Sequence, residues 1–143
     1  PLAWIDLSIL FSSVVEEFRL RCPDRSILLE DHSGGVALQE PMGTCHRVLH
    51  NLILNALEHG DAHGPIRVRA SAVEGQLRIE VTNTCSRLSS LRLVNALKNE
   101  ASTERFGLSS VRDCVRQLGG RLEDASDLAH SEVGVVMLIP LVS

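Results

Sequence analysis

Aromatic side chains are scarce in this sequence of 143 residues, which has three Phe, one Trp and no Tyr. A stacking platform for single-stranded nucleic acid needs several exposed aromatic rings. The 14 basic residues are scattered along the chain, and the formal net charge is −4. Because a nucleic-acid surface concentrates positive charge, we expect no nucleic acid partner.

Long hydrophobic runs and paired cysteines are also missing. No apolar run approaches the roughly 18 residues of a membrane helix, and no secretory signal is evident. Cys22, Cys45, Cys85 and Cys114 form no CxxC pair, which indicates reduced, mostly buried thiols and a cytoplasmic location. Since the chain opens on Pro1 rather than Met, we expect a piece of a longer protein. Any membrane anchor or sensor segment would then lie upstream.

The sequence is hydrophobic enough for one core, with 44% apolar residues, so we expect residues 1–143 to form a single domain. Periodicity and turn residues predict a helix that Asp6 caps and Pro23 ends, and further helices at 42–59 and 107–118. Strands are predicted at 26–30 and 36–39 (joined around Gly34-Gly35), at 66–70 and 77–81, and at 121–123 and 133–139. The stretch 84–105 is expected to hold a short helix. This order favours a two-layer α/β sandwich, a mixed, mostly antiparallel sheet with helices packed on one face.

The segment His46–Gly60, HRVLHNLILNALEHG, carries the main functional signal. Its apolar residues form one helical stripe, and Asn51 and Asn55 lie one turn apart beside that stripe. Asn has a poor helix propensity, so two in mid-helix need a reason. They are either tolerated on a solvated face, or they are neutral oxygen ligands for a hard cation or a polar ligand.

This Asn helix, the hairpin after it and the later helix that begins near Gly107 and ends at Gly119-Gly120 resemble one family over nearly the whole chain. It is the ATP-binding catalytic domain of two-component sensor histidine kinases, in the GHKL superfamily with the Bergerat fold. The resemblance implies binding of ATP and Mg2+, with Asn55 as the Mg2+ ligand. Asn51 would face the same pocket, and His59 would line the nucleotide site. Glu58 stands where the family commonly has a basic residue.

Two glycine-rich boxes of the family are degenerate here. In the first, Asn83 stands where the family has an Asp that accepts from the adenine amino group, and Cys85 replaces the first glycine. An Asn carbonyl can accept from the same amino group without charge assistance, so restoring Asp should tighten binding. In the second box only Gly107-Leu108 remains. The helix start there could hold phosphate oxygens, and Arg105 could add an ionic contact.

The resemblance also implies a reaction and partners. The γ-phosphoryl group of ATP would pass to a histidine on a separate dimerisation domain of the same protein, and then to a response regulator receiver domain. The full-length protein is expected to be a homodimer. His46 and His50 lack the sequence setting of the acceptor histidine, so no catalytic residue is expected within this chain.

Two other functions fit the same residues. Degenerate glycine boxes are typical of a domain of this fold that no longer binds ATP and serves as a docking, regulatory or phosphotransferase-like module. The run Asn55-Ala-Leu-Glu-His59-Gly60 also resembles anti-sigma-factor serine kinases. The C-terminal helix and the long hairpin after it favour the sensor kinase.

Overall fold

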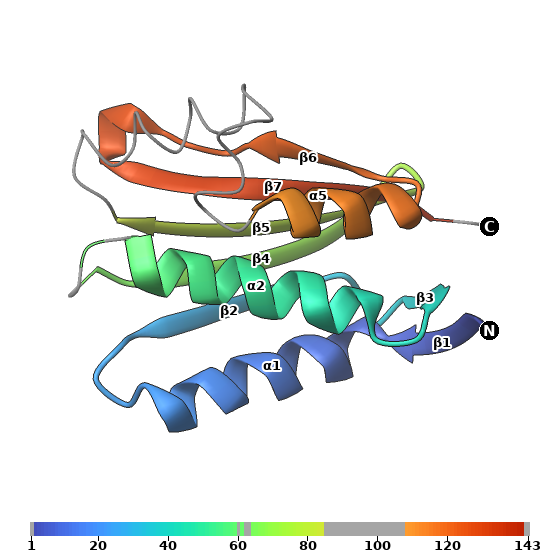
Figure 1. Cartoon of the computed structure of the whole chain (residues 1–143), viewed down its shortest axis with the longest axis horizontal. Coiled ribbons are helices and arrows are strands. Elements are labelled where there is room, and N and C mark those ends of the chain that lie inside the picture. Colours follow the sequence, from blue (N-terminus) through green and yellow to red (C-terminus); the bar gives the residue numbers. More distant parts are fainter. Residues whose placement is uncertain (1, 60, 62–63, 85–107, 142–143) are drawn as a thin grey trace.

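The computed structural model describes residues 2–59, 61, 64–84 and 108–141. Three helices lie together on one face of a five-stranded sheet, so the described part of the chain forms two layers (Figure 1). The helices are α1 (Leu7–Arg21), α2 (Thr44–His59) and α5 (Leu108–Gln117). The strands are β1 (Leu2–Asp6), β2 (Ile27–His32), β3 (Ala37–Pro41), β4 (Ile66–Val73), β5 (Gln76–Thr84), β6 (Arg121–Asp124) and β7 (Glu132–Pro140), with a short 3₁₀ turn, η2 (Leu128–His130), before β7.

The main sheet has the order β2-β4-β5-β7-β6. β2 and β4 run parallel, while the other neighbours are antiparallel. β1 and β3 form a separate antiparallel pair near the N-terminal end (Figure 1). The predicted class, a mixed and mostly antiparallel sheet with helices on one face, is confirmed.

α1 begins where the sequence predicts. Asp6 is its N-cap, and the side-chain Oδ1 accepts a hydrogen bond from the backbone N–H of Ile9 at 3.1 Å. This bond satisfies one of the amides that a helix start leaves without a partner. The inward stripe of α1 is fully buried at Leu7, Phe11, Val14 and Val15.

α2 begins at Thr44, two residues after the predicted start. A buried carboxylate fixes this start, because Oε2 of Glu40 accepts from the backbone N–H of Cys45 at 2.6 Å. A negative group is favoured there by the positive end of the helix dipole. The predicted apolar stripe is confirmed as core, with Val48, Leu49, Leu52, Ile53 and Ala56 all buried.

The sequence did not reveal β1, nor how the early strands pair. The predicted strands at 26–30 and 36–39 exist as β2 and β3, but they belong to different sheets. β2 pairs with β4, and β3 pairs with β1. Tertiary contacts decide these pairings, and local periodicity carries no information about them.

The predicted hairpin at 66–81 is confirmed as β4 and β5. Its two-residue turn, Glu74-Gly75, has positive φ at both residues, as a type I′ hairpin turn requires. Ile66, Val68 and Ala70 face the helices and are buried.

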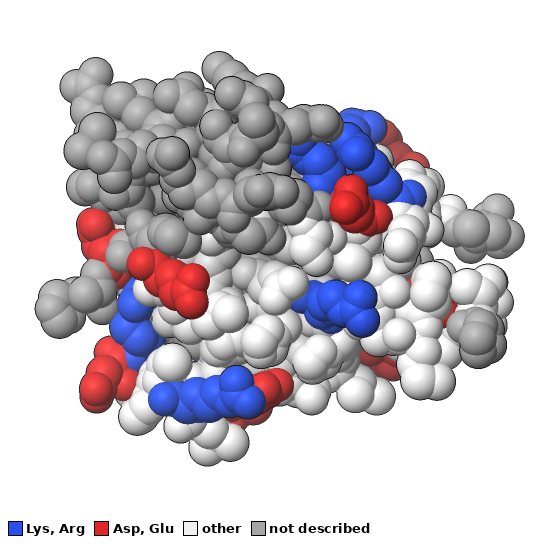
Figure 2. Space-filling view, in the orientation of Figure 1, with Lys and Arg blue, Asp and Glu red and all other residues white. Residues whose placement is uncertain are grey.

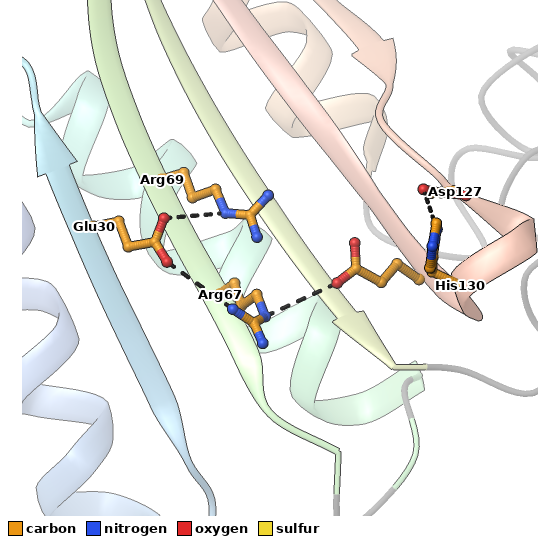
Figure 3. Close-up of polar contacts among 6 residues, drawn as sticks. Glu30, Arg67, Arg69, Asp127 and His130 are labelled. Carbon is orange, nitrogen blue, oxygen red and sulfur yellow. Dashed lines mark hydrogen bonds and ion pairs between the residues drawn. The ribbon is translucent and has the colours of Figure 1, made fainter.

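The face of the sheet that points away from the helices carries charged pairs instead. Figure 3 shows Glu30 of β2 between Arg67 and Arg69 of β4, with N–O distances of 3.9 and 3.3 Å. Arg67 also reaches Glu132 of β7 at 3.9 Å. The pairs of Glu30 join the neighbouring strands β2 and β4, whereas the pair of Arg67 and Glu132 spans β5.

The C-terminal hairpin is also confirmed. α5 stops at Gly119, whose φ of +76° suits a residue without a side chain. β7 lies between β5 and β6, in agreement with its apolar sequence, and is buried from Val133 to Ile139. At the beginning of β7, an added Cβ on Gly134 would lie 2.2 Å from the carbonyl oxygen of Val81. The glycine therefore permits the close approach of β7 to β5.

The helix expected within 84–105 lies outside the described residues. Among the residues that the structure describes, no helix is long and apolar enough to cross a membrane.

Candidate functional site

Asn51 and Asn55 both lie on α2, one turn apart, and both are half-buried. They stand beside the apolar stripe that faces the sheet and α5. A helix face that is neither core nor fully solvated can present side-chain amides to a bound ligand while its other side stays packed. The structure therefore gives both asparagines the kind of position that the sequence predicts for them.

Asn83 lies in β5 and is only 4% exposed. Its Nδ2 donates to the carbonyl oxygen of Ala56, at 3.4 Å, and to that of Thr84, at 3.3 Å. Ala56 follows Asn55 directly, so the amide of Asn83 joins the end of β5 to the last turns of α2. Two of the predicted residues, Asn55 and Asn83, are thus brought to neighbouring places in the fold.

Arg25, in the loop between α1 and β2, binds the C-terminal end of α2 and the segment that follows it. Its guanidinium donates to the carbonyl oxygen of Leu57 at 3.3 Å and to that of Asp61 at 3.0 Å. The N–H of Asp61 in turn donates to the carbonyl oxygen of Thr84 at 3.0 Å. A cation at a helix C-terminus satisfies carbonyls that have no partner within the helix, and it complements the helix dipole.

Sequence reasoning missed Arg25. Its partners lie 32 and 36 residues further along the chain, and no motif links it to them. An Arg shortly before a strand carries no local sign of such a contact.

Leu108 is the first residue of α5, and its side chain is fully buried in the core. Its side chain therefore anchors the start of the helix. The Leu108 side chain is therefore turned into the core, and its backbone N–H is the group that could meet a phosphate oxygen, as at other helix N-termini. α5 also packs against α2, so its first turn is held on the same layer as the two asparagines.

Four residues named in the sequence analysis are not fully described. Arg105 and Gly107 lie outside the described residues, as does Cys85. The backbone of His59 ends α2, but its side chain is not among those described.

The remaining cysteines match the expected thiols. Cys45 and Cys114 are free and buried, and Cys22 is half-buried. Burial raises the pKa of the Cys45 thiol, and the nearby carboxylate of Glu40 raises it further. A thiol held in its neutral form is a poor nucleophile.

His46 and His50 stack on each other with ring centroids 6.0 Å apart. In the part of the chain that the structure describes, no group of three or more His, Cys, Asp or Glu could hold a metal ion.

The sequence itself decides the family. Residues 43–141 match the family described as histidine kinase-, DNA gyrase B- and HSP90-like ATPase. The chain belongs to this ATPase family. The matched region begins just before α2 and includes every described residue of the candidate site except Arg25. No curated protein matches the chain.

Solved structures of histidine kinases share the fold of this chain. The catalytic domain of the histidine kinase ThkA, without nucleotide, superposes with a TM-score of 0.83 at 20% identity, over 98% of this chain and 95% of that one. The ATP-binding domain of PrrB from Mycobacterium tuberculosis gives 0.75 at 15% identity, over 99% and 98%. Full-length ShkA in complex with AMPPNP gives 0.77 at 20% identity, over 99% of this chain and 31% of ShkA. The chain therefore has the fold of histidine kinase ATP-binding domains.

Proposed function

We propose that this ATPase-family chain is the catalytic ATP-binding domain of a sensor histidine kinase, folded as one domain over residues 1–143. One observation carries the proposal. The chain matches a family of ATPases, and its helix α2 carries the half-buried Asn51 and Asn55 next to the end of β5. The hydrogen bond between Asn83 and Ala56 holds these two elements together.

The residues at the C-terminal part of α2 and the end of β5 suit a nucleotide with Mg2+. Side-chain amide oxygens are hard, neutral ligands of the kind that Mg2+ accepts beside phosphate oxygens. Mg2+, when bound, offsets the negative charge of the phosphates. Asn55 would hold the ion, Asn51 and His59 would line the pocket, and the start of α5 near Gly107 and Leu108 would hold phosphate oxygens with Arg105 beside it.

The orientation of Asn83 supports the choice of adenine. Its Nδ2 donates to two backbone carbonyls, so its Oδ1 is the atom that remains to accept a hydrogen bond from a base. The amino group of adenine is a donor, whereas guanine carries an acceptor at the same place. Turning the amide to serve guanine would break both bonds to the backbone, so we infer that the site prefers adenine.

The partners follow from the same proposal. The γ-phosphoryl group would go to a histidine on a dimerisation domain of the same protein, and then to a response regulator, within a cytoplasmic homodimer. The kinase ThkA has also been solved in complex with the response regulator protein TrrA. Our proposal extends this kind of partner to the present chain.

Titration calorimetry with AMPPNP and Mg2+ tests the proposal. We expect saturable binding by the unchanged chain and a loss of binding of at least about tenfold, or 1.4 kcal/mol, in Asn55→Ala. Leu54→Ala is the control, because Leu54 is the neighbouring residue on α2 and its side chain is 38% exposed. This control should bind like the unchanged chain.

Absence of binding at millimolar AMPPNP would overturn the proposal. It would favour the second candidate, a domain of this fold that no longer binds ATP. The observation in favour of that candidate is the replacement of the first glycine of the first box by Cys85.

A further inference from the structure

Arg25 contacts the place where the chain leaves α2 and turns towards β5. A helix continues when the N–H of one residue donates to the carbonyl oxygen four residues earlier, and Asp61 lies four residues after Leu57. The N–H of Asp61 donates instead to the carbonyl oxygen of Thr84. Nη1 of Arg25 donates to the carbonyl oxygen of Leu57 at 3.3 Å. The guanidinium thus replaces the helical donor at the point where α2 ends.

The same guanidinium also holds the segment after the helix. Nη2 of Arg25 donates to the carbonyl oxygen of Asp61 at 3.0 Å, and that oxygen also accepts from the N–H of Gly64 at 3.2 Å. One planar side chain therefore spans the last turn of α2 and the turn before β4. A planar guanidinium holds two acceptors in a fixed relative position, which a flexible ammonium group does less well.

The backbone on both sides of this guanidinium is fixed as well. The N–H of Arg25 donates to the carbonyl oxygen of Cys22 at 3.0 Å, and the carbonyl oxygen of Ser26 accepts from the N–H of Ile66 at 2.8 Å. The second bond leads into the parallel pairing of β2 with β4. Arg25 therefore connects the end of α2 to the sheet.

Stability alone does not account for this arginine. Its Nε is buried and has no hydrogen-bond partner among the residues that the structure describes. Burying an N–H without a partner costs free energy, and this cost offsets part of what the two other bonds contribute. The contacts of Arg25 should therefore matter more for the position of α2 than for the stability of the fold.

Net charge does not account for it either. Figure 2 shows acidic and basic side chains close together where α1 and α2 end. Neighbouring charges of opposite sign largely offset each other at a distance, so a general attraction for the phosphates of a nucleotide is not expected there. Any effect of Arg25 on a nucleotide should come from its contacts with the backbone.

We propose that Arg25 is a positioning residue for nucleotide binding, an inference that rests on the proposed function. Asn55 lies two residues before Leu57, and the residue between them, Ala56, accepts the hydrogen bond from Asn83. The contact of Arg25 with Leu57 therefore sets how Asn55 and Asn83 lie relative to each other. At 3.4 Å the bond from Asn83 to Ala56 is already long. A small shift of the end of α2 would break it and would allow the amide of Asn83 to turn.

Calorimetry with AMPPNP and Mg2+ on Arg25→Gln tests this role. We expect binding about tenfold weaker than in the unchanged chain, because the end of α2 is no longer held. Arg25→Lys keeps the charge without the planar fork and should also bind more weakly, by about threefold or more. Arg25→Lys serves in place of Arg25→Gln should that variant not fold.

Arg19→Gln is the matched control. Nε and Nη2 of Arg19 donate to the carbonyl oxygen of Ile27 at 3.2 and 2.8 Å, so this arginine also joins two elements, α1 and β2. Its further pair with Glu16 is exposed and contributes little. The control removes the same charge and two bonds of the same kind. It should bind AMPPNP like the unchanged chain, and urea denaturation compares the stability of the variants.

The preference for adenine gives a readout that a loss of stability would not change. The ratio of the affinities for AMPPNP and GMPPNP should fall in Arg25→Gln, because the amide of Asn83 is then free to turn. The ratio should stay unchanged in Arg19→Gln. Equal weakening for the two nucleotides in Arg25→Gln would indicate general loosening of the fold and would contradict a positioning role.

The remaining outcomes separate this inference from the proposed function. If the unchanged chain binds AMPPNP and Arg25→Gln and Arg25→Lys bind it equally well, only the role of Arg25 is overturned. Equal losses in Arg25→Gln and Arg19→Gln would overturn that role too, since charge or stability would then explain them. If the unchanged chain does not bind AMPPNP, the proposed function fails and the role of Arg25 fails with it.

Discussion

The amide of Asn83 is the residue-scale feature that links the fold to the site. It is buried, and it donates to one carbonyl in α2 and one in its own strand. An aspartate has no donor for those carbonyls, so the family's usual residue could not make the same link. Asn83 therefore has a structural role in addition to its proposed contact with adenine.

This double role gives a prediction for Asn83→Asp. The variant loses two hydrogen bonds and places a carboxylate near carbonyl oxygens, so the free energy of unfolding should fall by about 1–3 kcal/mol. Denaturation with urea measures this loss. Affinity for AMPPNP should nevertheless rise, because the charged oxygen gains its donor when adenine binds. An unchanged free energy of unfolding would contradict the structural role of the amide.

Some residues of the site could be predicted from the sequence, and others could not. The spacing of Asn51 and Asn55 on an apolar helix is a local pattern, so it was visible. The clamp that Arg25 makes on the end of α2 depends on a contact across more than 30 residues, and nothing local marks it. The hydrogen bond from Asn83 to the carbonyl of Ala56 in α2 was hidden for the same reason.

At the scale of elements, α1 offers a direct test of the capping assignment. Asp6→Ala removes the acceptor for the N–H of Ile9, and the free energy of unfolding should fall by about 1 kcal/mol. Asp6→Asn is the matched control, since its side-chain oxygen can accept the same bond, and it should stay close to the unchanged chain. Urea denaturation compares the three proteins. Equal losses in both variants would show that the charge rather than the cap is responsible.

The helices and hairpins could be predicted because their signals are local. The capping Asp6, the apolar stripes and the turn at Glu74-Gly75 each specify one element. β1 was missed because five residues with no clear alternation give no such signal. The parallel pairing of β2 with β4 was missed because α2 and other elements intervene between the two strands in the sequence.

At the scale of the whole molecule, nucleotide binding should stabilise the fold. A ligand that binds only the folded chain adds about 2.7 kcal/mol when its concentration is about 100 times Kd. Mg2+ with AMPPNP should therefore raise the temperature of thermal unfolding. The guanine analogue GMPPNP should raise it much less, given the fixed amide of Asn83. Equal increases in unfolding temperature for the two analogues would contradict the proposed preference of the site for adenine.

The two-layer fold itself follows from the order of elements and the family match, and it does not depend on nucleotide. The proposed chemistry depends on whether Asn55 meets a magnesium ion. A crystal structure of the chain grown with Mg2+ and AMPPNP tests this most directly. We predict the nucleotide between α2 and the end of β5, with Oδ1 of Asn55 about 2.1 Å from Mg2+. A structure in which the protein's own side chains fill that space, with no nucleotide bound, would contradict the proposed function.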